Sequence, residues 1–183
     1  MRKFAFTVLV LSSLWATSSR AQNASASASQ TVRLTLAPVI AFKFTATGSA
    51  EGNLVNLDFN NVNQFTNGVV SQDQELSIIS NKTFKVSVQT DAASFSYNGN
   101  NGNTAMPVDN TLFVSVKNNN TGGAVASGFN NSYQSLNAGS QDLLLNGQQG
   151  ADQRIVLAYK AKPGLNYPSG SYSVGVIYTA TQP

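Results

Sequence analysis

The longest regular pattern in this sequence is an alternation of apolar and polar side chains from Thr31 to Thr45. Every even-numbered position of the run is apolar, and the odd-numbered positions include threonine, arginine and lysine. Because successive side chains of a β-strand point to opposite faces, the run predicts strand with one face toward a core. Pro38 cannot donate a ladder hydrogen bond, so we expect it to divide the run into two strands or to mark a sheet edge.

Shorter runs of the same kind follow along the chain. They lie at residues 55–59, 76–78, 84–88, 95–97, 112–116, 155–159 and 172–180. Asn-Gly turn signals separate several of them, as at Asn67, Asn98 and Asn146, and no segment keeps a 3.6-residue apolar period over three turns. Disorder is the alternative for a chain this rich in Asn, Gln, Ser and Gly, but the regular alternation argues against it. The pattern predicts an all-β protein, a single β-sandwich of immunoglobulin-like or jelly-roll type with mostly antiparallel strands.

The first residues have the features of an export signal. Two basic residues, Arg2 and Lys3, precede an apolar stretch at residues 4–16, and small residues suited to cleavage lie just before Gln22. A retained membrane anchor is the alternative, but this stretch is too short to span a bilayer and no second stretch of spanning length follows. We therefore expect a mature chain without a membrane span, secreted or at the cell surface, having passed through the periplasm if the cell is Gram-negative.

These features divide the chain into three parts. A signal peptide (1–21) precedes a flexible Ser/Ala-rich tether (22–30), and the β-sandwich domain takes up residues 31–183.

Composition and charge remove several classes of function. The 183 residues carry a formal charge of +3, but three of the eleven basic residues and none of the eight acids lie in the predicted signal. The mature chain is thus neutral, which removes the electrostatic basis for binding nucleic acid or anionic lipid. The sequence has no histidine and no cysteine, which excludes Ser-His-Asp and Cys-His catalysis, disulfides and ordinary zinc sites. We expect neither an enzyme nor a cofactor.

Little candidate chemistry remains. Asp73 and Glu75 are the only close pair of carboxylates, and two solvated edge charges explain them better than glycoside hydrolysis. The Asn/Gly-rich stretch at residues 98–103 has too few nearby acids for a convincing calcium site. Phe129, Tyr133 and Tyr167 lie in loop-like contexts and are candidates for glycan binding. Rings in such loops also serve to cap the ends of a sandwich core, so both interpretations stay open.

Two segments carry a family resemblance. The ending from Tyr167 to Thr181 (YPSGSYSVGVIYTAT) and the segment from Asn81 to Val88 (NKTFKVSV) resemble pilin-like secreted bacterial β-sandwich domains. That group includes spore-coat-U-like proteins and chaperone–usher fimbrial subunits. The resemblance is one of pattern over most of the mature chain.

The resemblance implies assembly by strand addition, in which an N-terminal extension completes the sandwich of a neighbouring subunit. It places the donor positions at Val32, Leu34 and Leu36. The acceptor groove would be flanked by Tyr172, Val174, Val176 and Tyr178. Unlike many such subunits, this chain has no cysteine, and it has no glycine between Thr31 and Phe44.

The sequence thus favours a non-enzymatic, exported structural or adhesive cell-surface protein, a fimbria-like subunit whose partners are copies of itself or related subunits. The alternative is a monomeric secreted module that binds a surface glycan or cell-wall polymer.

Overall fold

The computed structural model of the chain describes residues 26–45, 54–100 and 105–183. The predicted signal peptide and residues 22–25 of the predicted tether lie outside these ranges. Residues Leu36–Pro183 form one compact unit, and the described residues before Leu36 belong to a separate one. Within the described ranges, no helix is both long enough and apolar enough to cross a membrane.

The larger sheet contains six strands. Its main path runs β1-β3-β11-β7-β9, and β2 pairs with β11 beside β3. Every pair in it is antiparallel. The bounds are β1 (Ile40–Thr45), β2 (Val69–Val70), β3 (Gln74–Ser80), β7 (Leu112–Asn119), β9 (Gln134–Ser135) and β11 (Gly150–Ala161).

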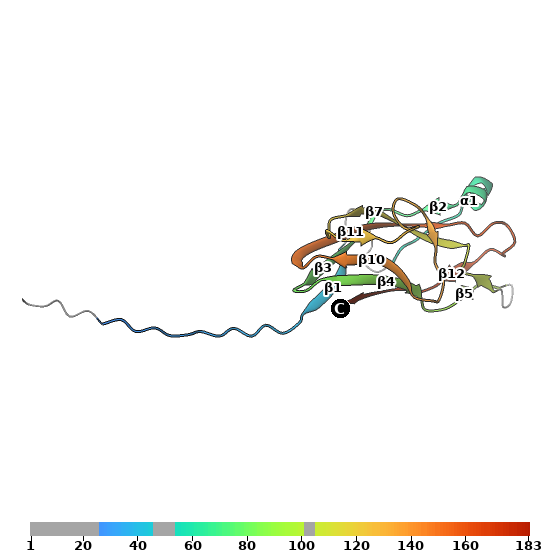
Figure 1. Ribbon diagram of the computed structural model, residues 1–183. Helices are drawn as coiled ribbons and strands as arrows, with labels where there is room; N and C mark the ends of the chain where they lie inside the picture. Colours follow the sequence, from blue (N-terminus) through green and yellow to red (C-terminus); the bar gives the residue numbers. More distant parts are fainter. Residues whose placement is uncertain (1–25, 46–53, 101–104) are drawn as a thin grey trace, which may run out of the picture. The chain divides into compact units, whose positions relative to one another are not determined.

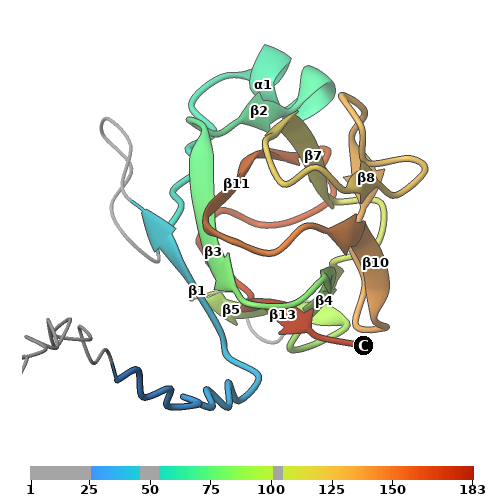
Figure 2. The ribbon, with the colours of Figure 1, turned by 60° about the vertical axis from the view of Figure 1, so that its left-hand side comes forward.

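A four-stranded sheet lies opposite, and Figure 2 shows the two layers from near one end. Its order is β13-β4-β10-β8, again antiparallel. A smaller group, β12-β5-β6, continues from its end, where β5 follows β4 and β12 precedes β13 (Figure 1). The bounds are β4 (Phe84–Thr90), β5 (Ser94–Asn98), β6 (Met106–Pro107), β8 (Ala124–Val125), β10 (Gln141–Gly147), β12 (Ser171–Ser173) and β13 (Val176–Thr181). The prediction of an all-β sandwich with antiparallel strands is confirmed.

The core lies between these two layers and follows the predicted alternation. Every second side chain of β3, β4, β7 and β11 points inward, and those at the centre are fully buried. They include Leu76, Ile78, Phe84, Val86, Val88, Val114, Ile155 and Leu157. The hydroxyls of Tyr159 on β11 and Tyr178 on β13 meet at 2.7 Å and join the two sheets inside the core.

Two local predictions differ from the structure. Residues 55–59 form no strand, although Val55, Leu57 and Phe59 are half-buried and pack against the core. The chain then forms a short helix, α1 (Val62–Asn67), which the apolar pattern does not indicate. A capping box explains it, because the Asn61 and Gln64 side chains each bond the other residue's backbone N–H.

The long N-terminal run is only partly a strand. β1 takes up its second half, while residues 26–39 belong to no strand or helix. Pro38 does divide the run, as its missing N–H predicts. The prediction of strand structure before Pro38 is not met within this chain.

Candidate partner-binding segment and sheet edge

The segment from Thr31 to Leu36 presents an apolar face that pairs with no strand among the described residues. Its alternating side chains Val32, Leu34 and Leu36 are 76%, 84% and 84% exposed. Val32 and Leu34 belong to the N-terminal unit, and Leu36 begins the compact domain. Burying one such side chain contributes about 1.5–3 kcal/mol of favourable free energy. Pairing of this face with an apolar surface would therefore be stabilising.

One asparagine side chain holds the chain that follows this segment. Asn81, in the turn between β3 and β4, accepts a hydrogen bond from the Val39 N–H at 2.8 Å and donates one to the Ala37 carbonyl at 2.7 Å. In an extended chain, the C=O of one residue and the N–H of the residue two positions later point to the same side. One side-chain amide can therefore bond both groups, as Asn81 does here. Gln182, just after β13, adds a bond to the Val39 carbonyl at 2.8 Å. We call these contacts the amide clamp.

The core is incompletely covered where β1 faces β13, the two terminal strands on this side of the sandwich. Phe44 of β1 packs edge-on against Tyr178 of β13, with ring centres 5.4 Å apart. Phe42 pairs in register with the fully buried Ile78 and so points to the same inner face. It is nevertheless 38% exposed. We call the line between β1 and β13 the open seam.

Three of the four predicted groove residues lie on β12 and β13, and the fourth lies between these strands. Val176 and Tyr178 lie on β13, which pairs with β4. Tyr172 lies on β12, which pairs with β5, and Val174 lies at the break between them. Tyr178 is buried, whereas the other three side chains are half-buried.

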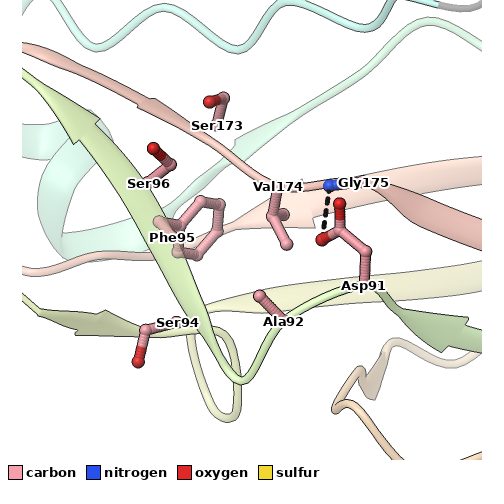
Figure 3. Close-up of a pocket in the computed structure, with 8 residues that line it drawn as sticks. All are labelled: Asp91, Ala92, Ser94, Phe95, Ser96, Ser173, Val174 and Gly175. Atoms are coloured by element: carbon pink, nitrogen blue, oxygen red, sulfur yellow. Dashed lines mark hydrogen bonds between the residues drawn. The ribbon is translucent and has the colours of Figure 1, made fainter.

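The break between β12 and β13 is organised by Asp91 (Figure 3). Its carboxylate Oδ1 accepts the Gly175 N–H at 2.9 Å, and its own N–H donates to the Gly175 carbonyl at 3.0 Å. A Cβ on Gly175 would clash with the Asp91 carboxylate, so the position suits glycine. A small hollow lined by Phe95 and Val174 opens beside it.

The three aromatic candidates do not form one site. Phe129 is only 3% exposed and belongs to the core, so its ring is not a surface platform. Tyr167 packs edge-on against Tyr172, with ring centres 6.5 Å apart. Tyr133 is half-buried beside Lys117, whose Nζ lies 4.4 Å from its ring centre. Loss of solvation raises the pKa of Tyr172, and the neighbouring Tyr97 and Tyr167 raise it further.

The carboxylate pair shows no convergent chemistry. Glu75 lies 3.1 Å from Arg154, which also pairs with Asp152. Such ion pairs near the surface contribute little to stability. Among the residues in the described ranges, no group of three or more acidic side chains is placed to hold a metal ion.

Sequence reasoning missed the amide clamp and the exposure of Phe42. In the sequence Asn81 is indistinguishable from an ordinary turn residue. Its partners Ala37 and Val39 lie more than forty residues earlier in the chain. The partial exposure of Phe42 depends on β1 being a terminal strand, which alternation alone does not reveal.

Comparison with known proteins adds no family to these observations. No protein-family model matches the sequence, and no curated protein matches it significantly. The pilin-like resemblance stays a prediction.

Proposed function

We propose that this protein is a non-enzymatic, exported structural or adhesive component of the cell surface. In this proposal its copies assemble as a fimbria-like polymer, in which the segment from Thr31 to Leu36 adds as a strand to a neighbour. The observation that carries the proposal is the exposed, strictly alternating face of Val32, Leu34 and Leu36. A chain that keeps three such side chains in water stabilises itself by finding a sheet edge elsewhere.

The open seam supplies a fitting acceptor. β13 is a terminal strand of its sheet, so one side of its backbone has no strand partner among the described residues. A strand added there lies opposite β1, and its inward side chains cover Phe42. Such an addition satisfies main-chain hydrogen bonds and completes the core in one step.

The amide clamp favours a neighbouring copy over the same chain as the acceptor. The hydrogen bond from Gln182 to Val39 shows that β13 ends beside the start of β1. To lie along its own β13, the segment would have to reverse direction at residues 37–39. That reversal would disrupt the extended geometry that Asn81 holds at Ala37 and Val39.

The test is the molecular mass of the purified full-length protein in solution. We expect multimers in the wild type and monomers in the double variant Leu34→Asp/Leu36→Asp, because charged side chains cannot enter the acceptor core. The matched control is Val62→Asp/Leu165→Asp, which changes two other apolar residues that are also largely exposed and lie outside the segment. It should assemble as the wild type does.

A wild-type protein that remains a stable monomer at high concentration would contradict strand addition. That outcome would favour the alternative, a monomeric secreted module that binds a glycan or cell-wall polymer. Unfolding of a wild-type monomer by the Leu34/Leu36 substitutions would show that the segment packs within its own chain.

A further inference from the structure

Two lysines and one tyrosine meet on the outward face of the larger sheet. Lys117 of β7 and Lys160 of β11 both alternate with buried residues and so point away from the core. Their Nζ atoms lie 4.4 Å and 5.9 Å from the centre of the Tyr133 ring. In the described ranges, neither lysine is within ion-pairing distance of a carboxylate. Among the described residues, the partner of the two ammonium groups at this point is thus an aromatic ring and not a carboxylate.

The acid on the neighbouring turn is engaged with other groups. Asp109 precedes β7 and accepts hydrogen bonds from Ser135 Oγ at 2.9 Å and from Asn110 Nδ2 at 3.1 Å. Its carboxylate is thus held by neutral donors.

The surrounding backbone fixes this group in place. On one side of Tyr133, the chain is bonded to Val116 of β7 through the Phe129 carbonyl at 2.8 Å and the Asn131 N–H at 2.9 Å. On the other side, β9 pairs with β7. Tyr133 lies between these two attachments, so little freedom remains for its backbone.

The Lys160 side chain lies close to a glycine, Gly68. Gly68 has a φ of +87°, and a Cβ there would lie 2.7 Å from Lys160 Cε. The missing side chain therefore leaves room for the lysine stem to lie against the backbone. A long side chain loses conformational entropy when it binds a ligand. That loss is smaller when its stem is already packed against the protein, which favours binding.

A polar hollow of about 460 Å³, open to solvent, adjoins Lys117. Its wall contains four asparagines, Asn118, Asn119, Asn130 and Asn131. The Asn119 amide is used internally, since it bonds to Gly123 and Thr121. The side-chain nitrogens of Asn118 and Asn130 make no hydrogen bond in the described part of the chain, so they can donate to a ligand.

We propose that this surface binds an acidic polysaccharide whose sugars carry carboxylates. The two lysines pair with carboxylates, and the amides of the hollow bond to sugar hydroxyls. A polar, amide-lined wall does not suit an apolar ligand. Nucleic acid needs several stacking platforms and a broad basic surface. This surface has a single half-buried ring, and the chain is neutral once its predicted signal is removed.

The site is separate from the open seam. β7 and β9 lie at the other end of the larger sheet from β1, and β8, which also lines the hollow, is the terminal strand opposite β13. Assembly through β13 would leave this side uncovered. The inference therefore stands or falls independently of strand addition.

The test is calorimetric titration of the full-length protein with a galacturonic acid oligomer at low salt. We expect the wild type to bind and the Lys117→Gln/Lys160→Gln variant to bind at least about tenfold more weakly, since each lost ion pair removes a charge-assisted hydrogen bond. The matched control, Lys43→Gln/Lys85→Gln, removes the same charge from other strands and should stay close to wild type. Equal thermal midpoints show that the variants are folded. If the site variant fails to fold, Lys117→Arg/Lys160→Arg keeps the charge and should still bind.

Several outcomes would overturn the assignment. The wild type failing to bind the oligomer at millimolar concentration is one. Equal weakening in the control variant would show only general charge attraction. Equally tight binding of oligothymidylate would indicate a site for any polyanion. Equal binding of a neutral glucose oligomer, unaffected by the lysine substitutions, would remove the role of the carboxylates.

Discussion

Tyr159 and Tyr178 show how single residues join the two layers. Burial raises the pKa of Tyr159 to about 12, and the hydrogen bond to Tyr178 partly offsets that rise. Burial also raises the pKa of Tyr178 well above its ordinary value, and the neighbouring Tyr159 raises it further. Neither hydroxyl can lose its proton without leaving a negative charge inside the core.

This pair predicts a loss of stability at alkaline pH. An unfolded tyrosine releases its proton near pH 10, whereas these two keep theirs in the folded protein. Above pH 10 the unfolded chain therefore binds fewer protons than the folded one, and stability falls by up to about 1.4 kcal/mol per pH unit for each tyrosine. The stabilising contribution is complete below pH 10 and declines as the pH rises toward and past 12. Urea midpoints at a series of pH values from 8 to 11.5 measure the effect.

The double variant Tyr159→Phe/Tyr178→Phe is the control for this prediction. It removes both hydroxyls together, so no buried polar group loses its partner. Its midpoint should depend less on pH above 10 than that of the wild type. An equally steep alkaline decline in this variant would show that other groups cause it.

At the scale of elements, period-two alternation predicted the strands that form the core. Val86, Val114 and Leu157 all lie on predicted inward faces, because burial on one side of a sheet fixes the side-chain period. The same alternation at residues 55–59 gives half-buried side chains without strand pairing. Alternation reports which side chains face a core, whereas a strand also needs a neighbouring backbone with which to pair.

The candidate site could be predicted only in part. Val32, Leu34 and Leu36 stand out in the sequence because their alternation is strict. The amide clamp and the Lys117–Tyr133–Lys160 group depend on contacts between distant segments, which no local pattern encodes. Phe129 illustrates the same limit, since a loop-like context gave no sign that its ring enters the core.

The proposed strand pairing predicts a specific intermolecular cross-link. The chain has no native cysteine, so introduced cysteines would be its only thiols. Inward side chains directly opposite on adjacent antiparallel strands have Cβ atoms about 4.5–5.5 Å apart, within the range that permits a disulfide. Leu34→Cys combined with Val176→Cys or with Ala180→Cys should therefore give covalent multimers under mild oxidation, in at least one of the two combinations. Non-reducing gels measure the result.

Leu34→Cys combined with Ser135→Cys is the matched control. Ser135 lies on β9, at the other end of the larger sheet from β1, and this pair should stay mostly monomeric on the gel. Cross-linking as efficient at position 135 as at positions 176 and 180 would contradict a defined acceptor edge.

At the scale of the whole molecule, the two proposed surfaces rely on different physical forces. Strand addition uses apolar side chains and main-chain hydrogen bonds, and residues 22–36 carry only one charged side chain, Arg33. The proposed sugar site uses two lysines without carboxylate partners among the described residues. The two surfaces also lie at opposite ends of the larger sheet. A polymer built through the open seam would then display one sugar site on every subunit.

Salt should therefore separate the two interactions in one protein. Raising sodium chloride from about 50 to 500 mM shortens the screening length and weakens pairing between exposed lysines and carboxylates, so affinity for the galacturonic acid oligomer should fall severalfold. Multimers should persist over the same range, because burial of Val32, Leu34 and Leu36 does not depend on charge, and sulfate should stabilise them further. Calorimetry and light scattering on one preparation measure both. Multimers that dissociate in sodium chloride would show that charge, and not the apolar face, holds the copies together.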